Sequence, residues 1–255
     1  MTLLAVERIK LLTTRSPWWC ALTALVLTSG FTALVVGNAS EEFPATVATT
    51  QFAYSFGMAV IMVLATLAIT TEYRFGTIRT TFQAVPNRSA ALLAKTTVVA
   101  VLALVIGEIM AFASWGLSLL LQPEADLALN GTADWLNVAG VGPACALAAV
   151  VAVAVGILVR HSAGAISLVL IYFLAVESLV PIIPSIGDDI YKWMPFNVLH
   201  KFVTGDGASN AGRVADAGAP LSTSTLSPGW ALVYFAVFAV GLLAIAIGTA
   251  RKRDA

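Results

Sequence analysis

Six long apolar runs, separated by shorter polar stretches, dominate the pattern of this chain. They lie at about residues 18–37, 52–70, 96–121, 139–159, 164–183 and 230–249. Each has about 18 residues or more and almost no charge, which is typical of a helix that crosses the hydrocarbon layer of a bilayer. What remains is too short for a soluble domain of ordinary size. The pattern predicts an all-α membrane protein in which residues 1–255 form a single transmembrane domain of six helices.

The segment ahead of the first run predicts a further, shorter helix. Residues 2–16 place leucines and Ile9 among three cations, Arg8, Lys10 and Arg15. An amphipathic helix of this kind lies on the membrane surface with its cations toward anionic headgroups. We therefore expect an N-terminal amphipathic interfacial helix, with an ordinary basic flank of the first span as the alternative.

The longest polar segment, residues 184–229, separates the last two runs. Its first half is aromatic and amphipathic, and its second half is rich in Gly, Ser, Ala and Pro. The first half is typical of an element at the membrane interface, and the second half is typical of a loop. We expect residues 184–229 to form an outer loop.

Composition agrees with the apolar pattern, and the distribution of charge gives an orientation. Hydrophobic residues make up 59% of the chain, charged residues 11%, and the mean hydropathy is +0.89. If the N-terminus is cytoplasmic, six crossings place 11 of the 14 cations on the inner side: Arg8, Lys10, Arg15, Arg74, Arg79, Arg88, Lys95, Arg160, Arg251, Lys252 and Arg253. Because cations concentrate on the cytoplasmic side of membrane proteins, we expect both ends of the chain to be cytoplasmic.

The residues of common catalytic and cofactor sites are missing from the sequence. There is no GxxxxGK[ST] motif for nucleotide phosphates and no HExxH motif for zinc. The two histidines, His161 and His200, are predicted on opposite sides of the membrane, so they do not make a metal site together. We expect a chain that is not an enzyme and holds no cofactor or metal of its own.

Two carboxylates fall inside predicted spans. Glu108 lies 13 residues from Lys95, and Glu177 lies 13 residues from Gly164. At 1.5 Å per residue, each is roughly 20 Å from the inner end of its helix. Ionisable groups at this depth usually face a bundle interior or a water-filled path. The pair therefore indicates either a polar substrate path or proton-linked sites, or else two hydrogen-bonded groups that tie helices together.

The fourth run carries a stripe of small residues. Ala144, Ala148, Ala152 and Gly156 recur every four positions. Small residues at this spacing let two helix backbones approach closely in lipid. The stripe predicts a helix-packing face, either within one subunit or between subunits.

A polar, basic island, TTEYRFGTIRTTFQAVPNRSAALLAK, occupies Thr70 to Lys95 between the second and third runs. The pattern of residues 71–88 predicts a short helix that lies parallel to the membrane and has an apolar side and a polar side. Gly76 permits a bend or a close backbone approach, and Pro86 ends the element. A basic inner loop with some helix is the alternative.

The order of residues in this island resembles that of ABC-2 type permeases, the six-span membrane subunits of ATP-binding-cassette exporters. The matching residues are Glu72, Tyr73, Arg74, Gly76, Thr77, Ile78, Arg79, Pro86, Arg88 and Lys95. The resemblance extends to the plan of the whole chain, with both ends inside and a long outer segment before the last span. The Ala/Val-rich spans are most similar to those of actinobacterial members.

The resemblance implies a transport subunit of a bacterial plasma membrane. Two permeases, identical or paralogous, would pair with two separate ATPase subunits that bind ATP and Mg²⁺, and no nucleic-acid partner is expected. Residues 71–88 would form a cytoplasmic coupling helix, with ATPase contacts at Glu72, Tyr73, Arg74, Gly76, Thr77 and Arg79. The apolar spans favour a hydrophobic or amphipathic cargo, such as a drug-like molecule or a lipid. There are two alternatives: an ion- or proton-coupled carrier that uses Glu108 and Glu177, and a membrane protein without transport activity.

Overall fold

The computed structural model describes residues 2–40, 44–85, 87–205 and 222–253. Every regular element in these ranges is a helix. Six helical stretches are long and apolar enough to cross a membrane: Ser16–Gly37, Thr49–Phe75, Arg88–Leu121, Val141–Val159, Ser162–Ile182 and Pro228–Lys252. The prediction of an all-α protein with six such helices is confirmed.

The order of the helical elements follows directly from the chain. In chain order they are α1 (Leu3–Leu12), α2 (Ser16–Gly37), a 3₁₀ turn (Thr49–Gln51), α3 (Tyr54–Phe75), α4 (Thr77–Ala84), α5 (Arg88–Leu121), α6 (Thr132–Ala139), α7 (Val141–Val159), α8 (Ser162–Ile171), a π-helical turn (Tyr172–Val176), α9 (Glu177–Leu179), a second 3₁₀ turn (Val180–Ile182), α10 (Gly187–Tyr191), α11 (Pro195–Thr204) and α12 (Pro228–Arg253). The fifth spanning stretch thus consists of α8, the π-helical turn, α9 and the second 3₁₀ turn.

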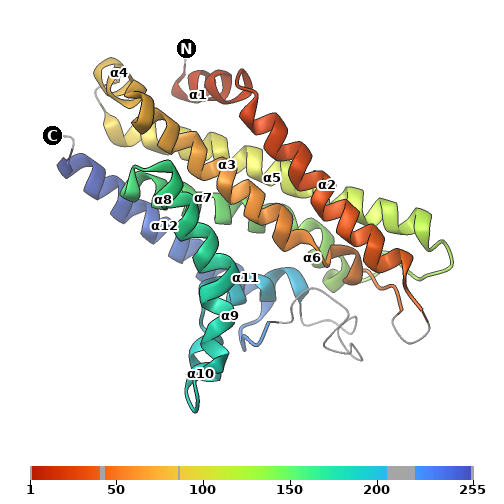
Figure 1. Ribbon diagram of the computed structural model, residues 1–255. Coiled ribbons are helices and arrows are strands. Elements are labelled where there is room, and N and C mark those ends of the chain that lie inside the picture. The colour runs from red at the N-terminus through yellow and green to blue at the C-terminus, as the bar shows by residue number, and fades with distance from the viewer. Residues whose placement is uncertain (1, 41–43, 86, 206–221, 254–255) are drawn as a thin grey trace.

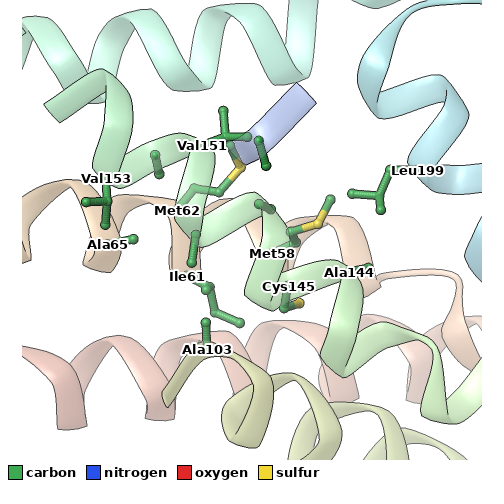
Figure 2. Packing of buried hydrophobic residues seen from close by; sticks show 14 of the residues in the cluster. Met58, Ile61, Met62, Ala65, Ala103, Ala144, Cys145, Val151, Val153 and Leu199 are labelled. Atoms are coloured by element: carbon green, nitrogen blue, oxygen red, sulfur yellow. The ribbon is translucent and has the colours of Figure 1, made fainter. Parts of the chain in front are cut away.

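Helix α7 lies at the centre of the bundle and packs against α3, α5 and α12 (Figure 1). Its sequence consists almost entirely of Ala, Val and Gly with a few larger apolar residues. Such small side chains let three neighbours approach one helix, and Met58 and Met62 of α3 fill the remaining space beside it (Figure 2). The core is therefore built around α7.

The predicted small-residue stripe faces the interior of this bundle. Ala144, Ala148 and Ala152 are fully buried, and Gly156 is buried as well. A Cβ atom at Gly156 would lie 2.5 Å from Cγ2 of Ile69, which is closer than carbon atoms pack. Of the two alternatives that the sequence left open, the structure therefore uses this face for packing within the chain, where Gly156 lies against α3.

The helices on either side of the polar island extend beyond the apolar runs. α3 continues through Phe75, five residues past the predicted end, and α5 already begins at Arg88. Backbone hydrogen bonding does not require apolar side chains, so a helix continues into the polar region until a residue breaks it. Residues 71–88 are consequently not one element: Glu72, Tyr73 and Arg74 belong to the last turn of α3, and α4 is separate. Pro86 lies outside the described residues.

The described first half of the predicted outer loop, residues 184–205, contains two helices, α10 and α11. Within residues 184–229, α11 buries Phe196, Val198, Leu199 and Val203 and packs against α12 and α6. The amphipathic pattern read from the sequence thus turns an apolar face toward the bundle. Residues 206–221, in the Gly- and Ser-rich half, lie outside the described residues.

Helices α1 and α4 lie at the same end of the bundle as the C-terminal end of α12 (Figure 1). Arg251 of α12 lines one surface recess together with Asn87, Arg88 and Ser89. The polar island and both described ends of the chain therefore share one side of the molecule.

Candidate functional site

Four charged side chains meet where α1, α3 and α5 converge. The Lys95 ammonium group donates to Oε2 of Glu7 at 2.5 Å and to Oε1 of Glu72 at 2.9 Å. Lys10 donates to Oε1 of Glu7 at 2.9 Å and lies 3.5 Å from Oε1 of Glu72. We call Glu7, Lys10, Glu72 and Lys95 the ionic cluster. Its two cations and two carboxylates balance in formal charge.

Three of the four side chains of the ionic cluster are shielded from solvent, whereas that of Lys10 is 39% exposed. The side chains of Glu7 and Lys95 are 6% and 8% exposed, and that of Glu72 is 13% exposed. Burial alone raises the pKa of Glu7, but the ammonium groups of Lys95 and Lys10 outweigh it and hold the pKa below its ordinary value. The Glu7 carboxylate is therefore charged at neutral pH and held by its partners.

Lys10 also connects the cluster to α4. Its ammonium group donates to Oγ1 of Thr81 at 3.2 Å. Burial lowers the pKa of Lys10, and the carboxylates of Glu7 and Glu72 raise it to a net value above the ordinary one. Four elements, α1, α3, α4 and α5, thus meet at one network of charge-assisted hydrogen bonds.

Helix α4 is set off from α3 by a single residue. Gly76 has a φ angle of +71°, and nothing lies within 4 Å of the position of a Cβ atom there. Of the two roles that the sequence allowed, Gly76 therefore makes a bend and not a close backbone approach. In α4 only Ile78 is buried, whereas Thr77, Arg79 and Thr80 are exposed.

The predicted contact residues divide into two groups. Glu72 and Tyr73 turn toward the bundle: Glu72 joins the ionic cluster, and the Tyr73 ring lies 5.1 Å from the guanidinium of Arg160. Arg74, Gly76, Thr77 and Arg79 are exposed. The second group is the more accessible on the surface, whereas Tyr73 is half-buried.

Glu177 is tied to a helix N-terminus. Its two carboxylate oxygens accept the backbone N–H groups of Phe196 at 3.0 Å and Asn197 at 2.9 Å. These residues are the second and third of α11, whose first residue is Pro195. N–H groups at this position have no partner inside their own helix, and the helix dipole favours a negative charge there. Glu177, which is 4% exposed, therefore links the fifth span to α11.

Glu108 has different surroundings. It is half-buried in α5, and its Oε1 atom lies 2.3 Å from the position that a Cβ atom would take at Gly142. The carboxyl group therefore lies directly over the first turn of α7, in space that glycine leaves open. Glu108 and Glu177 have different neighbours, and no hydrogen bond within the described part of the chain joins them.

Two polar contacts were missing from the sequence interpretation. Glu7 binds Lys10, three residues away, and also Lys95, which is 88 positions away in the sequence. The hydroxyl group of Tyr54 in α3 contacts Nδ1 of His200 in α11. Neither long-range contact has a signal in a single sequence, because each depends on how helices far apart in the chain pack.

Comparison of the chain with models of known protein families gives no match, and comparison with curated proteins gives none either.

Proposed function

We propose that this protein is the permease subunit of an ATP-driven exporter. In this proposal two permease chains form the translocation path, and two separate ATPase subunits bind ATP and Mg²⁺. The cargo is hydrophobic or amphipathic, such as a drug-like molecule or a lipid. The protein lies in a bacterial plasma membrane with both ends in the cytoplasm.

The observation that carries this proposal is the placement of α4. It is an eight-residue helix, separated from a spanning helix by the bend at Gly76, and it presents Thr77, Arg79 and Thr80 to solvent. It lies at the end of the bundle that also holds the N-terminal helix and the end of α12 (Figure 1). An exposed helix with a cation and hydroxyl groups offers a partner both charge-assisted and neutral hydrogen bonds.

The ionic cluster supports a mechanical role for α4. Through Thr81 and Lys10, α4 is connected to the same buried charges that hold α1 against α3 and α5. A displacement of α4 by an ATPase would therefore reach three helices at once. Two global arrangements of the bundle, biased by ATP binding in the partner, would provide alternating access.

The geometry of Glu177 weighs against the alternative of a carrier that moves protons through Glu108 and Glu177. A carboxylate that caps a helix with both oxygens is held in place, and protonation would weaken its two hydrogen bonds. Glu108 alone remains as a candidate for lining a substrate path.

A reconstitution experiment tests the assignment of α4. The permease and a candidate P-loop ATPase are purified together, and ATP hydrolysis is measured with and without the permease. We expect Arg79→Ala to lower co-purification or stimulation of hydrolysis several-fold, because it removes an exposed cation from α4. Arg8→Ala removes an exposed cation from α1 and is the matched control. Equal behaviour of the two variants and the unaltered protein would contradict the assignment.

Thiol labelling tests the proposed orientation. Asn130 is exposed in the connection between α5 and α6, on the side predicted to be outside. In a variant without Cys20 and Cys145, we expect Asn130→Cys to react with a membrane-impermeant reagent in intact cells. Labelling that occurs only after lysis would mean that the proposed orientation is inverted.

A further inference from the structure

A basic recess of about 750 Å³ opens between the end of α3, helix α4, the start of α5 and the turn from α7 to α8. Four arginines line it: Arg74, Arg79, Arg88 and Arg160. No Asp or Glu is among the described residues that line the recess. We call it the arginine recess.

The carboxylate of the polar island is directed away from the arginine recess. Glu72 is the only acidic residue between Thr70 and Lys95. Its carboxylate binds Lys95 and lies near Lys10, in the ionic cluster. Guanidinium groups gathered around one concave surface concentrate an electric field that attracts anions.

Aromatic rings hold three of the four guanidinium groups. The Cζ atom of Arg74 lies 5.6 Å from the centre of the Phe75 ring, that of Arg88 5.7 Å from Phe82, and that of Arg160 5.1 Å from Tyr73. Arginine binds ring faces through its planar surface, whereas its N–H groups point outward from the edge of that plane. These contacts orient the guanidinium groups before any anion arrives, which lowers the entropic cost of binding.

The turn that carries Arg160 has an unusual backbone. Arg160 ends α7 with a φ angle of +59°, in the left-handed region that favours glycine. A non-glycine residue in this region costs free energy, and such residues are often found at functional sites. Here the conformation brings an arginine, in place of the glycine that the turn favours, to the wall of the arginine recess.

We propose that the arginine recess binds a phosphate group, supplied by an anionic lipid headgroup or by a free phosphate. Arginine forms paired hydrogen bonds with phosphate oxygens, and several arginines around one recess can share the oxygens of one phosphate group. The recess lies at the end of the bundle where α1 and the end of α12 also lie (Figure 1), and Phe75, 71% exposed at its rim, suits contact with the apolar part of a lipid. The bound phosphate would join α4 to α5 and to the α7–α8 turn.

Two variants and one control separate phosphate binding from folding and from net charge. Arg160→Gly removes one guanidinium and places the preferred residue at a positive φ angle, so the turn is retained. Arg79→Gln removes an exposed guanidinium from α4, where it has little effect on packing. Arg8→Gln removes the same charge from α1, outside the arginine recess.

Binding is measured on the purified full-length protein in a neutral detergent. Native mass spectrometry records retention of phosphatidylglycerol against phosphatidylcholine, and thermal unfolding is followed with inorganic pyrophosphate. We expect the unaltered protein to prefer phosphatidylglycerol about tenfold or more, and Arg160→Gly and Arg79→Gln each to weaken this binding roughly tenfold. Arg8→Gln should stay within about twofold of the unaltered protein.

The two probes distinguish the source of the phosphate. Binding of phosphatidylglycerol without pyrophosphate identifies a lipid headgroup, and stabilisation by pyrophosphate that Arg79→Gln abolishes identifies the phosphate itself. Equal losses in Arg8→Gln and Arg160→Gly, or no binding of either probe, would overturn the proposal. If neither probe binds while Arg79→Ala still disrupts assembly with the ATPase, the arginine recess belongs to carboxylates of the partner, and the proposed function stands without the phosphate site.

Discussion

Replacement of Lys95 by methionine is the sharpest test of how the ionic cluster stabilises the protein. Lys95 lies between two carboxylates, 2.5 Å from Glu7 and 2.9 Å from Glu72. Methionine keeps the length and apolar character of the side chain but removes the charge. Glu7 and Glu72 then face one another with only Lys10 to compensate them.

The expected loss follows from the burial of these groups. Removing one partner of a buried ion pair leaves an uncompensated charge and costs about 3–5 kcal/mol, whereas an exposed pair contributes about 1 kcal/mol or less. Because Glu7 and Lys95 are almost fully buried, we expect Lys95→Met to lower the free energy of unfolding by about 3–5 kcal/mol. Adding Glu72→Gln to Lys95→Met restores charge balance and should recover part of this loss.

Denaturant or thermal unfolding in detergent measures the change, and limited trypsin digestion reports whether α1 has detached. The control is Arg8→Met, which removes an exposed cation from α1. The lowered pKa of Glu7 predicts that its contribution is complete at pH 7 and disappears as the pH falls through that lowered value. A loss no larger than that of Arg8→Met, or a further loss when Glu72→Gln is added, would refute this account.

Three further predictions concern other contacts. A Cβ atom at Gly107 would lie 2.9 Å from Cα of Gly142, whereas a Cβ atom at Gly116 of the same helix would have no atom within 4 Å. Gly107→Ala should therefore lower the free energy of unfolding by about 1–3 kcal/mol, and Gly116→Ala should be neutral or slightly stabilising. Glu177→Ala leaves two N–H groups of α11 without an acceptor and should lower the free energy of unfolding by about 1–3 kcal/mol, with a smaller loss for Glu177→Gln; equal stability of all three proteins would exclude the capping role. Burial lowers the pKa of His200 to about 4, so as the pH falls the unfolded chain binds the proton before the folded chain does. The free energy of unfolding should therefore decrease by up to about 3 kcal/mol as the pH falls from about 6.5 to about 4. A His200→Gln variant with the same pH profile would contradict this.

The cluster changes how variants of the polar island are to be interpreted. Glu72 and Arg79 both belong to the predicted contact set, yet Glu72 is held inside the chain and Arg79 is exposed. Loss of Glu72 should therefore destabilise the protein itself, whereas loss of Arg79 should act only on the binding of partners and ligands. Under the proposed function, a transport defect in a Glu72 variant would be evidence about an ATPase interface only when the stability of the variant is unchanged.

The sequence alone determined that the fold is all-helical and that six of its helices are long and apolar enough to span a membrane. Apolar runs of about 18 residues or more have few alternatives to a helix in a bilayer, because unpaired backbone groups are costly in hydrocarbon. The same logic indicated the stripe from Ala144 to Gly156, since small residues at a spacing of four share one face of a helix. The length of α3 was not determined in this way, because the apolar run ends at Thr70 and the helix ends only at Phe75, before Gly76.

Tertiary structure decided what the charged residues do. Glu72, Glu108 and Glu177 look alike in the sequence as single carboxylates in or beside spans, yet one joins an ion-paired cluster, one lies over Gly142 and one caps α11. Their partners lie on other helices, up to 88 positions away in the case of Glu7 and Lys95. Hydropathy depends on neighbours along the chain and so is visible in the sequence. The state of a buried charge depends on neighbours in space, which only the packing of the helices supplies.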